Sequence, residues 1–105
     1  MLDFRLASSA ISTLLSGLEK ESASDRYKTY TTIVHLLDDI ETHSRNSGID
    51  DWFIHEKILE LRVTLAHAAG LRDNGSNLQQ NVVMADTILK TLVSGLDYLQ
   101  LDPVK

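Results

Sequence analysis

Two histidines and an aspartate stand four residues apart, which places all three on one face of a helix. They are His35, Asp39 and His43. Imidazole and carboxylate groups at this spacing are potential metal ligands. The face points away from the apolar residues of the same segment, however, so it lacks the enclosing shell and the further ligand of a tight site. We therefore predict a solvated face with pairing between His and Asp side chains, and no metal or other cofactor.

A further histidine, His67, lies in the stretch LeuAlaHisAlaAlaGlyLeuArg at residues 65–72. This stretch is similar to the His-x-x-Lys-Gly pattern of histidine phosphotransfer domains, which are four-helix bundles in which a surface histidine accepts a phosphoryl group. The similarity covers eight residues, and Gly70 stands where the pattern has its basic residue. The resemblance implies phosphotransfer through His67 as the alternative to an ordinary surface histidine.

Other motifs of catalysis and ligand binding are missing from the sequence. It contains no cysteine, so disulfides, thiol nucleophiles and cysteine-based zinc sites are excluded. It also lacks a Gly-rich phosphate loop, a Gly-x-Ser-x-Gly elbow and the Glu-x-x-His pairs of di-iron bundles. We therefore predict that the protein is not an enzyme and that it acts by binding.

The composition narrows the classes of partner. A net charge of −5 argues against nucleic acid, because phosphate binding requires clustered Lys and Arg, and it favours basic protein partners. No run approaches the roughly 18 apolar residues that a membrane span requires. The N-terminal stretch resembles an export signal only superficially, since Asp3 and several serines interrupt it. We expect a cytoplasmic protein that binds no membrane.

The chain of 105 residues is long enough for one domain, residues 1–105, and its single proline, Pro103, leaves the interior free of helix breakers. Apolar residues recur at spacings of three and four in four segments, which predicts helices over about 3–20, 25–46, 51–69 and 77–101. Glycines and capping residues mark the predicted ends: Gly48 and Gly70 as C-caps, capping boxes of Ser22 with Asp25 and Ser76 with Gln79, and Asp50 as an N-cap.

Segment 77–101 is the most regular of the four. Its apolar arc covers about half of the circumference, more than a helix lying on a surface needs, so other helices must enclose it. The residues of this arc are Leu78, Val82, Ala85, Leu89, Leu92, Leu96 and Leu99, widened by Met84, Ile88 and Val93. With short connections, the sequence predicts an all-α, small four-helix antiparallel bundle, either complete in itself or completed by dimerisation.

Segment 51–69 carries two apolar stripes. The first predicts its share of the core and consists of Ile54, Ile58, Leu61, Leu65 and Ala68. The second, here named the outer stripe, consists of Trp52, Leu59, Val63 and Ala66. Because one apolar face is enough for a helix at the edge of a bundle, the outer stripe is either an intermolecular contact or evidence that this helix is central.

Segment 3–20 combines a predicted core stripe with a face of small hydroxyl side chains. The core stripe is Ala7, Ala10, Ile11, Leu14 and Leu18, with Phe4 and Leu15 at its shoulder; the serines are Ser8, Ser9, Ser12 and Ser16. The serine face is either neutral and solvated or a place where another helix approaches closely.

Together these features predict a small acidic, non-enzymatic helical protein that acts through protein–protein contact, as a regulator, inhibitor or antiactivator, immunity protein or chaperone-like protein. The predicted partner is a second copy of the chain, another protein, or both. The predicted binding residues are the outer stripe, Trp52, Leu59, Val63 and Ala66, followed by Ser9, Ser12 and Ser16 on the serine face.

Overall fold

The computed structural model describes residues 4–46, 48, 51–70 and 77–101, and they form an all-α four-helix bundle, as predicted. Its helices are α1 (Phe4–Gly17), α2 (Ala23–Asn46), α3 (Trp52–Ala68) and α4 (Leu78–Leu101), and a short 3-10 helix, η1 (Leu18–Lys20), extends α1. The helices begin and end within two residues of the predicted bounds, except that α1 ends at Gly17, three residues before its predicted end, and η1 continues to Lys20. Long segments with regular apolar spacing leave little freedom in where a helix lies.

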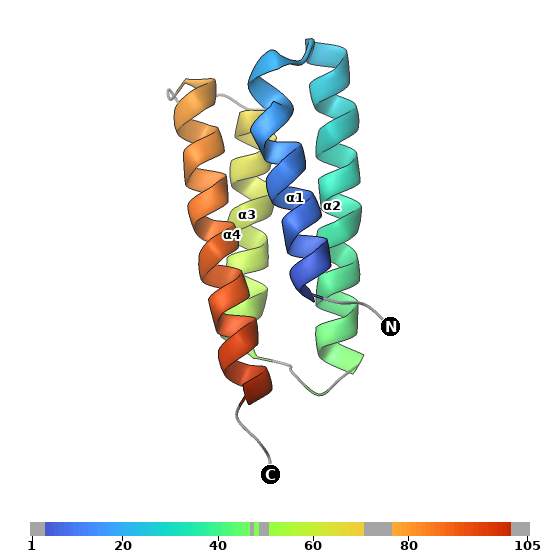
Figure 1. Cartoon of the computed structure of the whole chain (residues 1–105), viewed down its shortest axis with the longest axis vertical. Coiled ribbons are helices and arrows are strands. Elements are labelled where there is room, and N and C mark those ends of the chain that lie inside the picture. The colour runs from blue at the N-terminus through green and yellow to red at the C-terminus, as the bar shows by residue number, and fades with distance from the viewer. Residues whose placement is uncertain (1–3, 47, 49–50, 71–76, 102–105) are drawn as a thin grey trace.

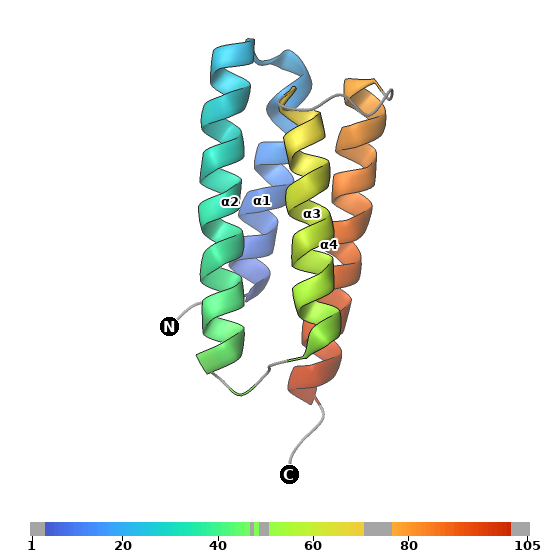
Figure 2. The same cartoon turned by 180° about the vertical axis from the view of Figure 1, so that it is seen from behind.

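The four helices run alternately up and down, so that each is antiparallel to the next (Figure 1). Contacts join α1 to α2, α2 to α3 and α3 to α4, and α1 and α4 close the ring. The view from behind shows α3 and α4 side by side along their whole length (Figure 2), and this pair makes the most extensive contact in the bundle. No helix in the described part of the chain is both long and apolar enough to cross a membrane.

Helix termini largely follow the predicted chemistry. The Asp25 amide donates to Ser22 Oγ at 3.2 Å, as the predicted capping box requires. The capping box of α4 is formed by Asn77 and Gln80, whose side chains each accept the other's amide at 2.8 and 3.0 Å. The predicted pair of Ser76 with Gln79 involves Ser76, which lies outside the described residues.

The N-cap of α3 is Asp51 and not Asp50 as predicted. The Asp51 carboxylate accepts the amide of Phe53 at 2.8 Å, which satisfies a backbone donor that the helix leaves unpaired. Gly48 and Gly70 have φ of 85° and 81°. Both glycines therefore adopt the left-handed conformation that the predicted C-caps require.

One apolar core fills the space between the four helices. The arc of α4 is buried as predicted at Ala85, Leu89, Leu92 and Leu96, whereas Met84 is exposed. The stripe of α1 is buried as predicted at Ala7, Ile11 and Leu18. Phe4, Ile11 and Leu15 are buried, while Ala10 is exposed, because the larger side chains gain more by leaving water.

Helices α3 and α4 approach closely where Gly95 faces Phe53. A Cβ atom at residue 95 would lie 2.7 Å from Cε2 and 3.1 Å from Cδ2 of the Phe53 ring, and 3.5 Å from Cδ1 of Ile54. The first of these separations is shorter than van der Waals contact allows. The missing side chain of Gly95 is therefore what lets the Phe53 ring pack between the two helices.

Gly95→Ala should destabilise the protein even though alanine is the better helix former. Overpacking of a filled site costs about 1–3 kcal/mol, which exceeds the gain of about 1 kcal/mol in helix propensity. Gly17→Ala is the matched control, because nothing lies within 4 Å of the position of its new Cβ, and it should stabilise the protein slightly. Denaturant unfolding would measure both variants; equal stabilisation by the two would show that Phe53 moves aside without cost.

Leu92→Ala tests whether α4 is enclosed as the fold requires. Leu92 is fully buried, so the substitution should lower the free energy of unfolding by about 2–5 kcal/mol through lost burial and a residual cavity. Val83→Ala, on the exposed side of the same helix, should change it by less than about 0.5 kcal/mol. Similar denaturation midpoints for the two variants would contradict the enclosure of α4.

Candidate functional site

Most of the outer stripe lies on the surface of the bundle. The exposed fractions are 72% for Trp52, 61% for Leu59 and 40% for Val63. Ala66 is only 9% exposed, because a single methyl group close to the helix axis is covered by its neighbours. Three of the four residues therefore have no place in the core, and protein binding by this stripe stays a prediction.

The exposed side chains of α3 and α4 meet in a shallow groove of about 390 Å³. We call this the α3–α4 groove; its lining consists of Glu56, Leu59, Glu60, Val63, Thr64, Met84 and Ile88. Two antiparallel helices rise equally per residue. The pairing of Gly95 with Phe53 therefore brings Leu59 beside Ile88 and Val63 beside Met84.

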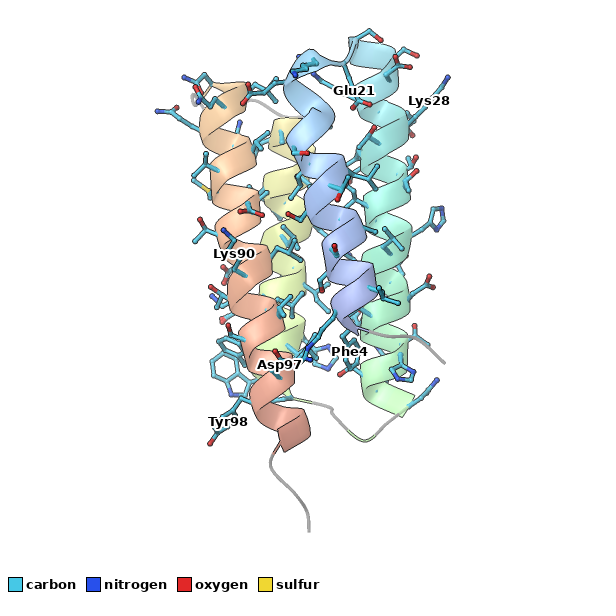
Figure 3. All side chains as sticks on the ribbon, in the orientation of Figure 1. Phe4, Glu21, Lys28, Lys90, Asp97 and Tyr98 are labelled. Atoms are coloured by element: carbon cyan, nitrogen blue, oxygen red, sulfur yellow. The ribbon has the colours of Figure 1, made fainter. Side chains whose placement is uncertain are left out.

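Large side chains extend this apolar surface beyond the groove. On α4, Tyr98 projects outward near the C-terminal end of the helix (Figure 3). On α3, the Trp52 ring meets the Phe53 ring edge-on, with centroids 6.3 Å apart. Because Phe53 is seated against Gly95, it gives the exposed indole a fixed support.

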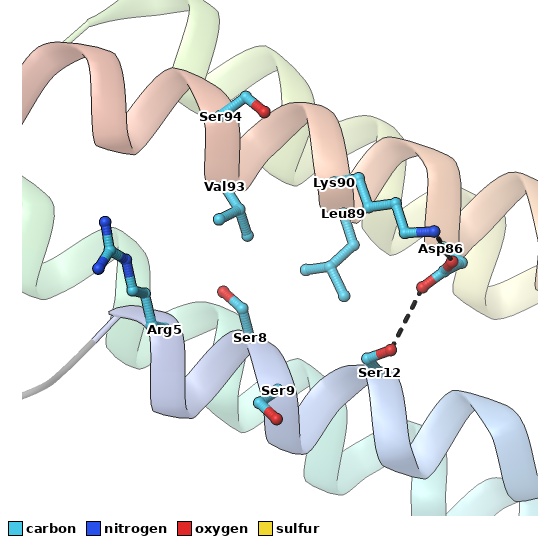
Figure 4. A pocket seen from close by; sticks show the side chains of 9 residues that line it. All are labelled: Arg5, Ser8, Ser9, Ser12, Asp86, Leu89, Lys90, Val93 and Ser94. Atoms are coloured by element: carbon cyan, nitrogen blue, oxygen red, sulfur yellow. Dashed lines mark hydrogen bonds and ion pairs between the residues drawn. The ribbon is translucent and has the colours of Figure 1, made fainter.

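The four serines of α1 lie on the side of the helix that faces α4, but they differ in burial. Ser8 is buried against α4, and Ser12 Oγ donates to Asp86 at 3.4 Å, so α1 and α4 approach closely at these small side chains (Figure 4). Ser9 is exposed, and Ser16 is exposed with its hydroxyl donating to the Thr13 carbonyl at 2.7 Å.

These serines border a second groove, of about 370 Å³, which we call the α1–α4 groove. Its lining consists of Arg5, Ser8, Ser9, Ser12, Asp86, Leu89, Lys90, Val93 and Ser94 (Figure 4). Ser8 Oγ is buried and has no hydrogen-bond partner among the described residues. The structure thus brings Ser9 and Ser12 together, but on a surface separate from the outer stripe.

The residues of the predicted histidine face do not gather at a site. His35 and Asp39 are exposed, as expected. The expectation of a solvated face is wrong for His43, which is half-buried with its ring edge-on to Phe4 at a centroid distance of 5.3 Å. Within the described ranges, no group of three or more His, Asp or Glu side chains could hold a metal ion.

His67 lies in the last turn of α3 and is half-buried, whereas the resemblance to phosphotransfer domains implies a surface histidine. Its Nδ1 atom is buried without a hydrogen-bond partner among the described residues. A phosphoryl donor cannot reach that nitrogen in this conformation. Phosphotransfer through His67 stays a prediction.

An ion network that the sequence did not reveal joins α2 to α3. The Arg62 guanidinium contacts Asp38 and lies 3.3 Å from Glu41, and His55 Nδ1 donates to the other Glu41 oxygen at 3.0 Å. Arg45 approaches the same carboxylate at 4.0 Å. In the sequence, each residue of this network lies next to a core position of its own helix. Recognising the network from the sequence would also require knowing that α2 and α3 are neighbours.

This network shifts the ionisation of Glu41. Burial raises the pKa of the Glu41 carboxyl, but the hydrogen bond from His55 and the positive charges of Arg62, His55 and Arg45 outweigh it. The pKa therefore lies below its ordinary value of 4.5, so folding favours the ionised form.

Comparisons with protein-family models, with curated proteins and with solved structures found no match to this chain.

Glu41→Gln should lower the free energy of unfolding by about 1–3 kcal/mol near neutral pH, because it weakens charged hydrogen bonds at a largely buried acceptor. Since the folded pKa is depressed, the stability that the Glu41 carboxylate contributes is complete above pH 4.5 and is lost as the pH falls through the folded pKa. The difference from wild type, measured by denaturant unfolding, should therefore shrink in acid.

Asp39→Asn is the control for this experiment, because it removes an exposed carboxylate from the same helix. It should leave neutral-pH stability within about 0.5 kcal/mol of wild type. A difference between wild type and Glu41→Gln that stays constant from neutral pH into acid would show that the network does not depend on ionised Glu41.

Proposed function

We propose that this protein is a non-enzymatic interaction module that acts by docking another polypeptide along the α3–α4 groove. The observation that carries the proposal is the run of exposed apolar side chains on both walls of one groove. An exposed apolar surface of this kind is a cost to a protein that stays alone, because it invites aggregation. A partner that covers the surface removes that cost and gains the free energy of its burial.

Trp52 is the natural anchor of such an interface. Tryptophan is enriched among the residues that dominate binding energies, since its large rigid ring buries much area at little cost in conformational entropy. The Trp52 ring meets the Phe53 ring edge-on, and the residue is 72% exposed, so most of its surface is available to a partner. Leu59 and Val63 continue the contact along α3 in the direction of Met84 on α4.

The proposed role matches the remaining chemistry of the chain. A small acidic helical protein with no recognised catalytic motif acts by occupying a partner's surface, as a regulator, an inhibitor or antiactivator, an immunity protein or a chaperone-like protein. The net charge of −5 directs such a protein away from nucleic acid and toward basic protein surfaces. We place it in the cytoplasm as part of the same proposal.

Leu59→Glu combined with Val63→Glu should abolish binding and leave the fold intact. Both side chains are largely exposed, so the double variant should remain helical, with a free energy of unfolding within about 1 kcal/mol of wild type. Circular dichroism and denaturant unfolding would measure the fold. Analytical ultracentrifugation and capture of interacting proteins from the native host would measure association, which the buried charges should prevent.

The matched control is Leu6→Glu with Ala10→Glu, which adds two charges at the same spacing to exposed positions of α1. It should preserve association. If the α3 double variant unfolds while the α1 control stays folded, the outer stripe belongs to the core. If both variants associate like wild type, the α3–α4 groove is not the binding surface.

A further inference from the structure

We propose that the occupant of the α3–α4 groove is a cationic amphipathic helix from another protein, and not a second copy of this chain. This inference rests on the proposed function, because it names the partner of the same surface. Two features of the groove carry it: the shape of its apolar floor and the sign of the charges in its lining.

The floor has the dimensions of a short helical contact. From Glu56 to Thr64 the α3 wall rises about 12 Å, which corresponds to roughly two turns of a docked helix. A helix contacts such a floor through apolar side chains at positions i, i+4 and i+7, as in other helix-in-groove complexes. Met84 forms part of the opposite wall, and its flexible thioether adapts to differently shaped side chains.

The charged residues that line the groove are both carboxylates, Glu56 and Glu60. Lys57 lies 3.3 Å from Glu60 and 5.5 Å from the centroid of the Phe53 ring, so it partly balances one carboxylate. Glu56 forms no ion pair with any residue that the structure describes. The lining therefore offers net negative charge at the edge of an apolar floor.

The α4 wall adds no positive charge to this groove. Its lining residues, Met84 and Ile88, are uncharged. Lys90, the single cation in the sequence of α4, lies in the α1–α4 groove, where it pairs with Asp86 at 3.0 Å. A partner that brings Lys or Arg to the edge of the α3–α4 groove consequently meets unbalanced carboxylates.

A second copy of this chain has the wrong charges for the same position. A two-fold contact places the same residues of both protomers in one interface, so Glu56 and Glu60 would appear twice in a lining without a cation. The net charge of −5 on each copy adds repulsion at longer range. A cationic helix replaces both repulsions, within the groove and at longer range, with attraction. The aliphatic parts of its Lys and Arg side chains also cover apolar surface while their charged ends stay hydrated.

Three synthetic helical peptides would test the inference by fluorescence anisotropy. All carry leucine at i, i+4 and i+7, and they differ only in having Lys, Gln or Glu at the flanking positions. The Lys peptide should bind wild-type protein about two- to thirtyfold more tightly than the Gln peptide at low salt, because two exposed charge pairs contribute modestly. The Glu peptide should bind more weakly than the Gln peptide, and added salt should reduce the differences.

Variants of the protein then locate the effect. Glu56→Gln with Glu60→Gln should bring the Lys and Gln peptides to similar affinity, whereas Leu59→Glu with Val63→Glu should abolish binding of every peptide. The matched control, Glu19→Gln with Asp39→Asn, removes the same charge from exposed positions away from the groove and should retain the preference for Lys. Retention of that preference by the Glu56→Gln and Glu60→Gln variant would overturn the inference.

Failure of the inference and failure of the proposed function give different results. In the first case, wild type binds the Lys and Gln peptides with equal affinity, and the α3 substitutions Leu59→Glu and Val63→Glu abolish both interactions. That result would leave a docking groove that does not select its partner by charge. A concentration-dependent dimer that the same substitutions dissociate would make a second copy the occupant. Absence of both peptide binding and self-association would remove the proposed function together with the inference.

Discussion

The close approach of α3 to α4 is the constraint on which the rest of the structure depends. Gly95 admits the Phe53 ring between the two helices, and this contact fixes their relative register. The register decides which exposed side chains become neighbours, so that Leu59 and Val63 face Ile88 and Met84 across one groove. The contact of Gly95 with Phe53 thereby determines which residues lie next to one another in the α3–α4 groove.

Helix α3 is held by different forces on its two sides. Toward α4 it packs by apolar contact and by the absence of a side chain at Gly95. Toward α2 it is held by the ion network around Glu41 and Arg62, in which charges on neighbouring helices satisfy one another. Because the other sides of α3 contact α2 and α4, its exposed face has no structural role inside the bundle. Substitutions on that face can therefore alter binding without altering the fold.

The sequence predicted the fold well and the candidate site in part, for physical reasons. Long regular segments define helices, but overlapping caps are not distinguishable: Ser76 with Gln79 and Asn77 with Gln80 fit the same pattern, and the structure forms the second. A small residue on the border of a stripe, such as Ala10, is assigned wrongly because its burial depends on larger neighbours. Predicting contacts between helices, including the ion network, requires knowing which helices are neighbours, and the spacing of apolar residues does not show this.

The α1–α4 and α3–α4 grooves differ in what a partner would gain from them. In the α1–α4 groove, Ser12 and Lys90 both bind the Asp86 carboxylate, so an incoming ligand must compete with hydrogen bonds that the protein already makes. In the α3–α4 groove, Leu59, Val63 and Met84 make no such bonds, and burying them releases only water. The free energy of a polar exchange is small, whereas that of apolar burial grows with the area covered. The α3–α4 groove is therefore the surface of the two where a docking partner disrupts fewer existing polar contacts, even though their volumes are similar.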